Sequence, residues 1–198
     1  MTDCFLLLSV LRWVRMAEVK PFAPAKLIAG IISSQDEYFT RTGEVLEVLY
    51  GPVDLRSPFF PFKLTDYYEK QMGKDLRRLF LSFAALVPPE ALSEIKIRTN
   101  ALEEEMRDAF AGKGRLVNVD PGILTGSALF IATTKDFAHR VPLRQGIYAH
   151  LELLFTKTAA HFLPWTYPDF QQEVYQKFFL EVRRIYLKQL RQLKDDGR

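Results

Sequence analysis

Residues 118–140 combine an apolar run with side chains that could bind an anion or exchange a proton. The stretch reads NVDPGILTGSALFIATTKDFAHR, and its polar side chains include Asn118, Asp120, Lys135, His139 and Arg140. Cationic N–H groups give charge-assisted hydrogen bonds to phosphate. We therefore expect a small polar or phosphorylated ligand, nucleotide-like in chemistry, whose anionic group meets the last three of these residues.

Aromatic and acidic side chains elsewhere could complete such a pocket. We expect Tyr67, Tyr68 and Tyr148 to form its stacking wall and Asn118 to add a polar contact. Asp120 and Glu69 are the carboxylates that general acid–base chemistry would use, if the protein catalyses a reaction. The sequence identifies no cofactor.

Nucleotide-binding motifs are absent from the sequence. The GKGR stretch at 112–115 has the wrong spacing for a P-loop and follows a helical pattern, whereas a P-loop precedes its helix. TTKD at 133–136 lacks the residue that separates Lys and Asp in the guanine motif, and there is no GxGxxG. There is also no G-x-S-x-G, and the only cysteine is Cys4. GTP hydrolysis and nucleophilic serine or cysteine chemistry are therefore not indicated.

The histidines do not show the spacing of a metal site. His139, His150 and His161 lie eleven residues apart, without HExxH or paired i, i+4 ligands. Strand geometry could place His150 and Glu152 on one face near Asp120, although a solvated sheet face explains the same pattern. We predict no metal ligands.

Composition limits the class of protein. The 198 residues are 48% hydrophobic and 26% charged, with 27 basic and 24 acidic side chains and a net charge of +3, too small to imply nucleic acid binding. One cysteine excludes an intramolecular disulfide and suits a reducing cytosol. Residues 1–15 are too short for a membrane span, so we expect an N-terminal extension before a start at Met16 and a single domain over 16–198.

Hydrophobic periodicity predicts an α+β fold, with a largely antiparallel or mixed sheet flanked by helices. Strands are expected at 26–33, 53–62, 75–87, 115–119, 128–134, 139–143 and 147–155. Helices are expected from a capping box at Ser34 and Glu37 to about residue 50, briefly at 65–73, over 88–110, and from Asp169 to the C-terminal region.

Three finer predictions concern the later part of the chain. The Asp-Pro-Gly sequence at 120–122 predicts a turn. Strict alternation in 147–155 predicts that Ile147, Ala149, Leu151, Leu153 and Phe155 share one face. In the last helix, Val174, Phe178, Val182 and Ile185 are expected to form the buried stripe.

Two other functions remain open. Lys177, Arg184, Lys188 and Arg191 fall on one side of the last helix, which favours an RNA-binding or protein-interaction module. The macrodipole alone would also favour cations at that end. A third hypothesis is a hydrolase whose carboxylates converge only in the folded chain.

The chain resembles a bacterial family, domain-of-unknown-function family 4416. The resemblance covers Lys20 to Tyr186 and rests on KLIAGIIS, TDYYEKQMG, NVDPGILT, ATTKDFAHR, GIYAHLEL and PWTYPDF. It implies a cytosolic, single-domain bacterial protein, but no activity, cofactor or catalytic residues. Some members are labelled GTP-binding, although the motifs above do not support that label. The family usually has an acidic residue at the position of His150.

Overall fold

The strands assemble into one antiparallel sheet. The computed structural model describes residues 18–63, 68–112 and 114–196. Within them the strands are β1 (Ala25–Ser33), β2 (Val53–Arg56), β3 (Phe60–Pro61), β4 (Arg77–Val87), β5 (Asn118–Leu124), β6 (Ala128–Thr133), β7 (Arg140–Pro142), β8 (Tyr148–Phe155) and β9 (Ala160–Phe162). Their order is β2-β4-β1-β5-β6-β8-β7, with β3 beside β4 and β9 beside β8. The predicted antiparallel α+β class is confirmed.

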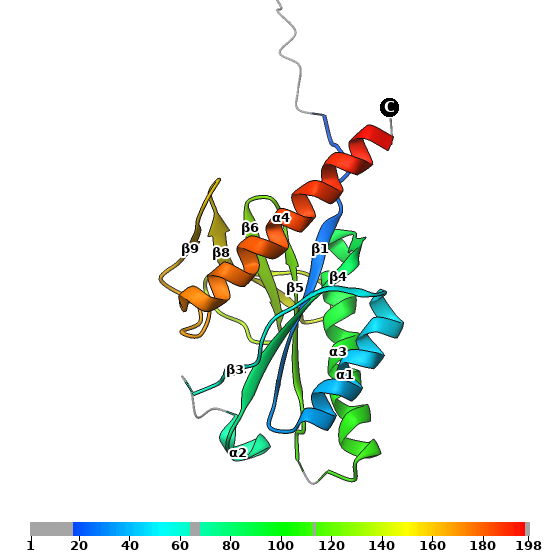
Figure 1. Ribbon diagram of the computed structural model, residues 1–198, viewed down its shortest axis with the longest axis vertical. Helices are drawn as coiled ribbons and strands as arrows, with labels where there is room; N and C mark the ends of the chain where they lie inside the picture. The colour runs from blue at the N-terminus through cyan, green and yellow to red at the C-terminus, as the bar shows by residue number, and fades with distance from the viewer. Residues whose placement is uncertain (1–17, 64–67, 113, 197–198) are drawn as a thin grey trace, which may run out of the picture.

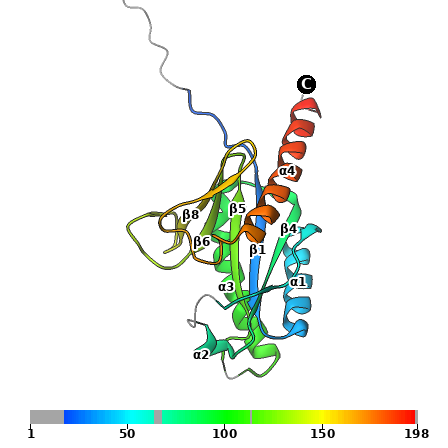
Figure 2. The same cartoon turned by 60° about the vertical axis from the view of Figure 1, so that its left-hand side comes forward.

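Helices cover both faces of this sheet. They are α1 (Asp36–Tyr50), α2 (Glu69–Met72), α3 (Leu92–Ala109), which follows a 3₁₀ turn at Pro89–Ala91, and α4 (Glu173–Asp196). Helices α1 and α3 pack on one face, and α4 lies diagonally across the other (Figure 1). Figure 2 shows the sheet between these layers. Among the described helices, none is long and apolar enough to span a membrane.

Strand β1 is the centre of the fold. Every one of its residues is buried, because β4 and β5 pair on its two edges and helices cover both of its faces. Leu27 and Ile31 point into the core under α1 and α3, whereas Ile28 points into the core under α4. A strand buried on both faces has a continuous apolar sequence, which is the pattern of KLIAGIIS.

The core under α4 is largely aromatic. The ring of Phe80 from β4 contacts Phe170, Tyr175, Phe178 and Phe179 at centroid separations of 4.8–5.7 Å. These contacts fix α4 and the segment before it on the sheet. The segment matters because it carries part of the site described below.

Both helix boundaries predicted from capping residues need correction. The N-cap of α1 is Gln35, without a side-chain capping bond, so Ser34 lies one residue too early for the capping box. Helix α4 begins later than predicted, at Glu173, and the carboxylate of Asp169 binds Arg78 of the sheet. The stripe in α4 is also different: Phe178 and Val182 are buried, but Val174 is exposed and Ile185 is half-buried.

The remaining members of the buried stripe are Tyr175, Phe179 and Tyr186. The buried face of α4 is therefore rotated slightly about the helix axis relative to the predicted face. Four of the five buried residues are aromatic, so α4 faces the sheet mainly with rings, beside the single aliphatic side chain of Val182.

The predicted turn at 120–122 is wrong. Strand β5 continues through Pro121 and Gly122, which pair with Ala29 and Ile28 of β1. The chain turns later, at 125–127, where the Thr125 hydroxyl accepts hydrogen bonds from the backbone N–H groups of Ser127 and Ala128. Pairing with the central strand β1 therefore overrides the turn propensity of the Asp-Pro-Gly sequence.

The predicted face of residues 147–155 is also wrong in part. Leu129 pairs with Leu153, but Phe130 pairs with Leu151, so Glu152 is an extra residue in β8. Such a bulge reverses the alternation of side chains. As a result, Ile147 packs under α3 and Leu153 under α4.

Candidate functional site

A pocket of about 510 Å³ opens where β5 and β6 separate. The two strands pair only from Gly122 and Ile131 onward, so the preceding half of β5 pairs with β1 alone. Pro121, which has no N–H to donate, lies where this separation starts. The pocket therefore has strand edges on two sides.

Both faces of the sheet supply side chains to this pocket. Arg78 comes from β4, Asn118 and Asp120 from β5, and Thr133 from β6. Helix α3 adds Lys96 and Asn100, whereas Tyr167, Pro168 and Asp169 precede α4. Because α3 and α4 lie on opposite faces, the opening brings the two layers together.

Arg78 is one of two buried cations in the pocket lining, the other being Lys96. Its guanidinium donates to Asp169 Oδ2 at 2.5 Å and to Asp120 Oδ2 at 3.3 Å. Burial alone would lower the pKa of the Arg78 guanidinium. The two neighbouring carboxylates, Asp169 and Asp120, instead hold this pKa above its ordinary value. The Nε atom is buried and has no hydrogen-bond partner among the described residues. A buried donor without a partner is uncommon in native proteins, and a bound water, ion or ligand can supply the missing acceptor.

Asp120 is held by two hydrogen bonds and one longer ion pair. Besides Arg78, the Asn118 amide donates to its Oδ2 at 2.8 Å, and Lys96 Nζ lies 3.7 Å from its Oδ1. Lys96 Nζ also donates to the Val119 carbonyl at 2.8 Å. The side chain of Asp120 is 22% exposed, so this fixed carboxylate can still accept from a bound molecule.

Two further cations extend the positive side of the pocket. Arg115 lines it and forms a close ion pair with Glu103. Burial raises the pKa of the Glu103 carboxyl, and nearby Lys96 and Arg115 counteract that effect. Lys135 lines the pocket from the end of β6 and is exposed.

Tyr68 and Tyr167 contribute aromatic surface to the pocket. Burial raises the pKa of both phenols. Both hydroxyls therefore keep their protons at neutral pH and can donate hydrogen bonds. Arg115 lies 5.7 Å from the Tyr68 ring centroid, which places cation and aromatic surface together.

Arg140 does not line the pocket, but it binds two residues that do. It donates to the Lys135 carbonyl at 2.7 Å, to the Tyr167 hydroxyl at 2.8 Å and to His150 Nδ1 at 3.1 Å. One guanidinium thus fixes two of the pocket residues. Because arginine only donates, His150 Nδ1 must be an acceptor, which puts the proton of a neutral His150 on Nε2.

The predicted site residues that the structure describes divide into three groups. Asn118, Asp120, Tyr68 and Lys135 line the pocket together. Arg140 and His139 lie behind it, where His139 stacks on Trp165 with centroids 5.1 Å apart. Glu69, in α2, and Tyr148, in β8, do not line it. Tyr67 lies outside the described residues, as does the proposed extension at 1–15.

Sequence reasoning missed Arg78, Lys96 and Arg115. Arg78 had a detectable signal, because it is a charged residue that directly precedes the largely apolar, buried run at 79–83. Lys96 and Asn100 lie one turn apart on α3, so helical spacing alone places them on one face. Among the described residues there is no group of three His, Cys, Asp or Glu side chains arranged to hold a metal.

These features define an α+β protein whose antiparallel sheet opens into a charged, aromatic-walled pocket. A protein-family model described as a domain of unknown function, DUF4416, matches residues 23–186. The chain belongs to this family. Comparison with curated proteins and with solved structures gave no match.

Proposed function

We propose that the protein binds a small, anionic, most simply phosphorylated, ligand in the pocket between β5 and β6. The charge of the lining is the observation that carries this proposal. Four cationic side chains line the pocket, namely Arg78, Lys96, Arg115 and Lys135, against two carboxylates, Asp120 and Asp169. Both carboxylates bind Arg78.

The positions of the cations favour a ligand that enters from solvent. Arg78 lies at the buried end, whereas Lys135 is exposed. Lys96 is buried, and one of the three N–H groups of its ammonium donates to the Val119 carbonyl. An anionic group near Lys135 and Lys96 would receive charge-assisted hydrogen bonds. Glu103 offsets part of the charge of Arg115, so Arg115 contributes less to this attraction.

The rest of the pocket suits a ring-bearing ligand. A volume of about 510 Å³ lies within the range of small-molecule sites. The Tyr68 and Tyr167 rings provide apolar surface on which such a ring can pack. Asp120 would accept from a ligand hydroxyl or amine. A nucleotide fits this description, although no feature of the pocket selects guanine.

A thermal-shift screen tests the proposal. The panel contains inorganic phosphate, nucleoside phosphates and sugar phosphates, each with and without Mg²⁺. A ligand at a hundredfold excess over its Kd adds about 2.7 kcal/mol to the free energy of unfolding, which is readily measured. We expect one class of phosphorylated compound to raise Tm, and the rise to disappear in Lys135→Ala.

The matched control is Lys74→Ala, which removes another exposed lysine outside the pocket lining. It should retain the full shift. The proposal fails if no anion on the panel raises Tm, or if Lys135→Ala and Lys96→Met respond to the same ligand as strongly as the unchanged protein does.

A further inference from the structure

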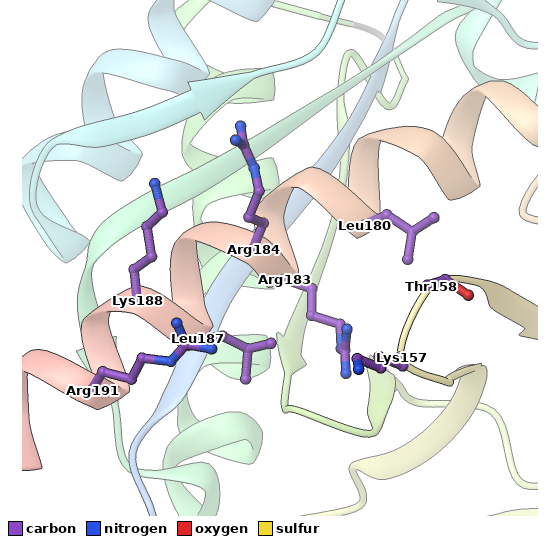
Figure 3. Close-up of a pocket in the computed structure, with 8 residues that line it drawn as sticks. All are labelled: Lys157, Thr158, Leu180, Arg183, Arg184, Leu187, Lys188 and Arg191. Atoms are coloured by element: carbon purple, nitrogen blue, oxygen red, sulfur yellow. The ribbon is translucent and has the colours of Figure 1, made fainter.

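A second, separate groove runs along α4 and carries only positive charge. Five cationic side chains line it: Lys157 from the β8–β9 turn and Arg183, Arg184, Lys188 and Arg191 from α4 (Figure 3). Its volume is about 320 Å³, and no carboxylate lines it. In Figure 3 the charged ends of Arg183 and Lys157 point toward one another across the groove.

Most of this charge is not neutralised by the protein. Arg184 pairs with Glu181 at 3.2 Å, and Arg183 donates to the Gly126 carbonyl at 2.8 Å. Within the described part of the chain, Lys157, Lys188 and Arg191 have no carboxylate at ion-pair distance. Like charges brought together around one hollow repel each other, and an anionic occupant would remove that repulsion.

Arg183 is fixed in place, unlike a freely solvated surface arginine. Its guanidinium lies 5.7 Å from the ring centroid of Phe155, in addition to its bond to Gly126. The β8–β9 turn that carries Lys157 is also ordered by local bonds, since the Thr156 hydroxyl accepts from the Ala159 N–H at 3.2 Å. Two sides of the groove therefore have a defined geometry.

The groove also contains apolar surface. Leu180 and Leu187 line it while also packing against the core under α4. They are seven residues apart, which places them two turns apart on the same side of the helix. An occupant must therefore offer apolar groups as well as negative charge.

This combination favours an acidic peptide over RNA. Single-stranded RNA binds proteins through a basic track together with aromatic side chains on which bases stack. The lining of this groove contains leucines and no aromatic residue. An acidic segment with an apolar side chain between its carboxylates complements both the cations and the leucines.

We propose that the α4 groove docks an acidic, leucine-containing segment of a partner protein. The carboxylates of the segment pair with Lys157, Lys188 and Arg191, and its apolar side chain rests on Leu180 and Leu187. The groove shares no lining residue with the pocket between β5 and β6. This site is thus independent of the proposed ligand pocket.

Fluorescence anisotropy on the full chain tests the proposal. The probe is a short labelled peptide in which single leucines separate pairs of glutamates, and a second probe replaces each leucine with serine. We expect the first probe to bind with an affinity that falls as salt rises, and the second to bind more weakly. A Lys188→Glu, Arg191→Glu double variant should raise the Kd of the first probe by about tenfold or more.

The matched control is Lys177→Glu, a charge reversal on α4 outside the groove lining. It should change Kd by no more than about twofold. Absence of peptide binding would overturn the proposal, as would equal losses in Lys177→Glu and in the double variant. Tighter binding of an oligouridylate than of the peptide, weakened by the same double variant, would assign the groove to RNA instead.

Discussion

His150 Nε2 lies 2.9 Å from Glu152 Oε2, and both side chains are fully buried. His150 and Glu152 are two positions apart on β8, and Glu152 is the extra residue of the bulge in that strand. The backbone N–H of Tyr167 donates to Glu152 Oε1 at 2.6 Å, and the His150 ring stacks on Tyr167 at 4.8 Å. The buried pair therefore positions a tyrosine of the pocket.

The stability of the protein should depend on pH through Glu152. Burial raises the pKa of this carboxyl, and His150 and the Tyr167 N–H offset the effect only in part. The native state thus holds the proton to a higher pH than the unfolded chain does. Between the ordinary value of 4.5 and the raised value, the contribution of Glu152 to the free energy of unfolding falls as pH rises.

Glu152→Gln cannot ionise and keeps an oxygen that can accept from Tyr167. Relative to the unchanged protein, this variant should therefore gain in free energy of unfolding as pH rises from about 4 to about 8. Urea unfolding over that range measures the difference. A difference that stays constant with pH would show that Glu152 ionises equally well in both states.

Elements with strong local patterns could be predicted from the sequence. The buried run at 26–33 becomes β1, and Leu92, Ile95, Leu102 and Met106 of α3 are all buried as their helical spacing indicates. Those patterns depend on one periodicity within one element. The Pro-Gly step in β5 and the bulge in β8 depend on the neighbouring strand, so no local pattern reveals them.

The pocket could be predicted only in part for the same reason. Asn118 and Asp120 alternate along one strand, so their shared face follows from sequence. Arg78 lies 42 residues from Asp120 and 91 from Asp169. The order and register of the strands bring Arg78 to Asp120, and the packing of the segment before α4 on the sheet adds Asp169. Arg140, predicted to meet the anionic group of a ligand, does not line the pocket, and its guanidinium binds Tyr167, Lys135 and His150.

Removing the charge of Arg78 should strongly destabilise the fold. Arg78→Met leaves Asp169, whose side chain is 9% exposed, without its buried cation. Breaking a buried pair from one side costs about 3–5 kcal/mol. Urea unfolding at neutral pH should show a loss of that size. The double variant Arg78→Met, Asp169→Asn should recover part of it, because it removes the stranded charge; equal losses in the single and double variants would contradict this account.

His139 should titrate below the ordinary histidine range. Burial is the largest cause that lowers the pKa of His139, and the neighbouring His150 and Arg140 lower it further. A ¹H–¹³C NMR titration should therefore give a midpoint below 6.5. Arg140→Gln should move the midpoint upward, whereas Arg144→Gln, which removes the same charge from an exposed position that pairs with Glu94, should not. Equal shifts in both variants would mean that the effect is not specific to Arg140.

Gly122 fixes the point where β5 and β6 begin to pair, so its substitution should disturb both stability and the pocket. A Cβ atom there would lie 2.5 Å from the Phe130 carbonyl oxygen and 2.6 Å from Ile131 Cδ1. The backbone oxygen cannot rotate away, so the strands must separate further. Gly122→Ala should cost about 1–3 kcal/mol in urea unfolding. Gly126→Ala is the matched control, because its nearest neighbour would be Leu187 Cδ2 at 3.7 Å, an ordinary contact. Similar stability in the two variants would show that the close approach of Gly122 to β6 is not needed to set the opening.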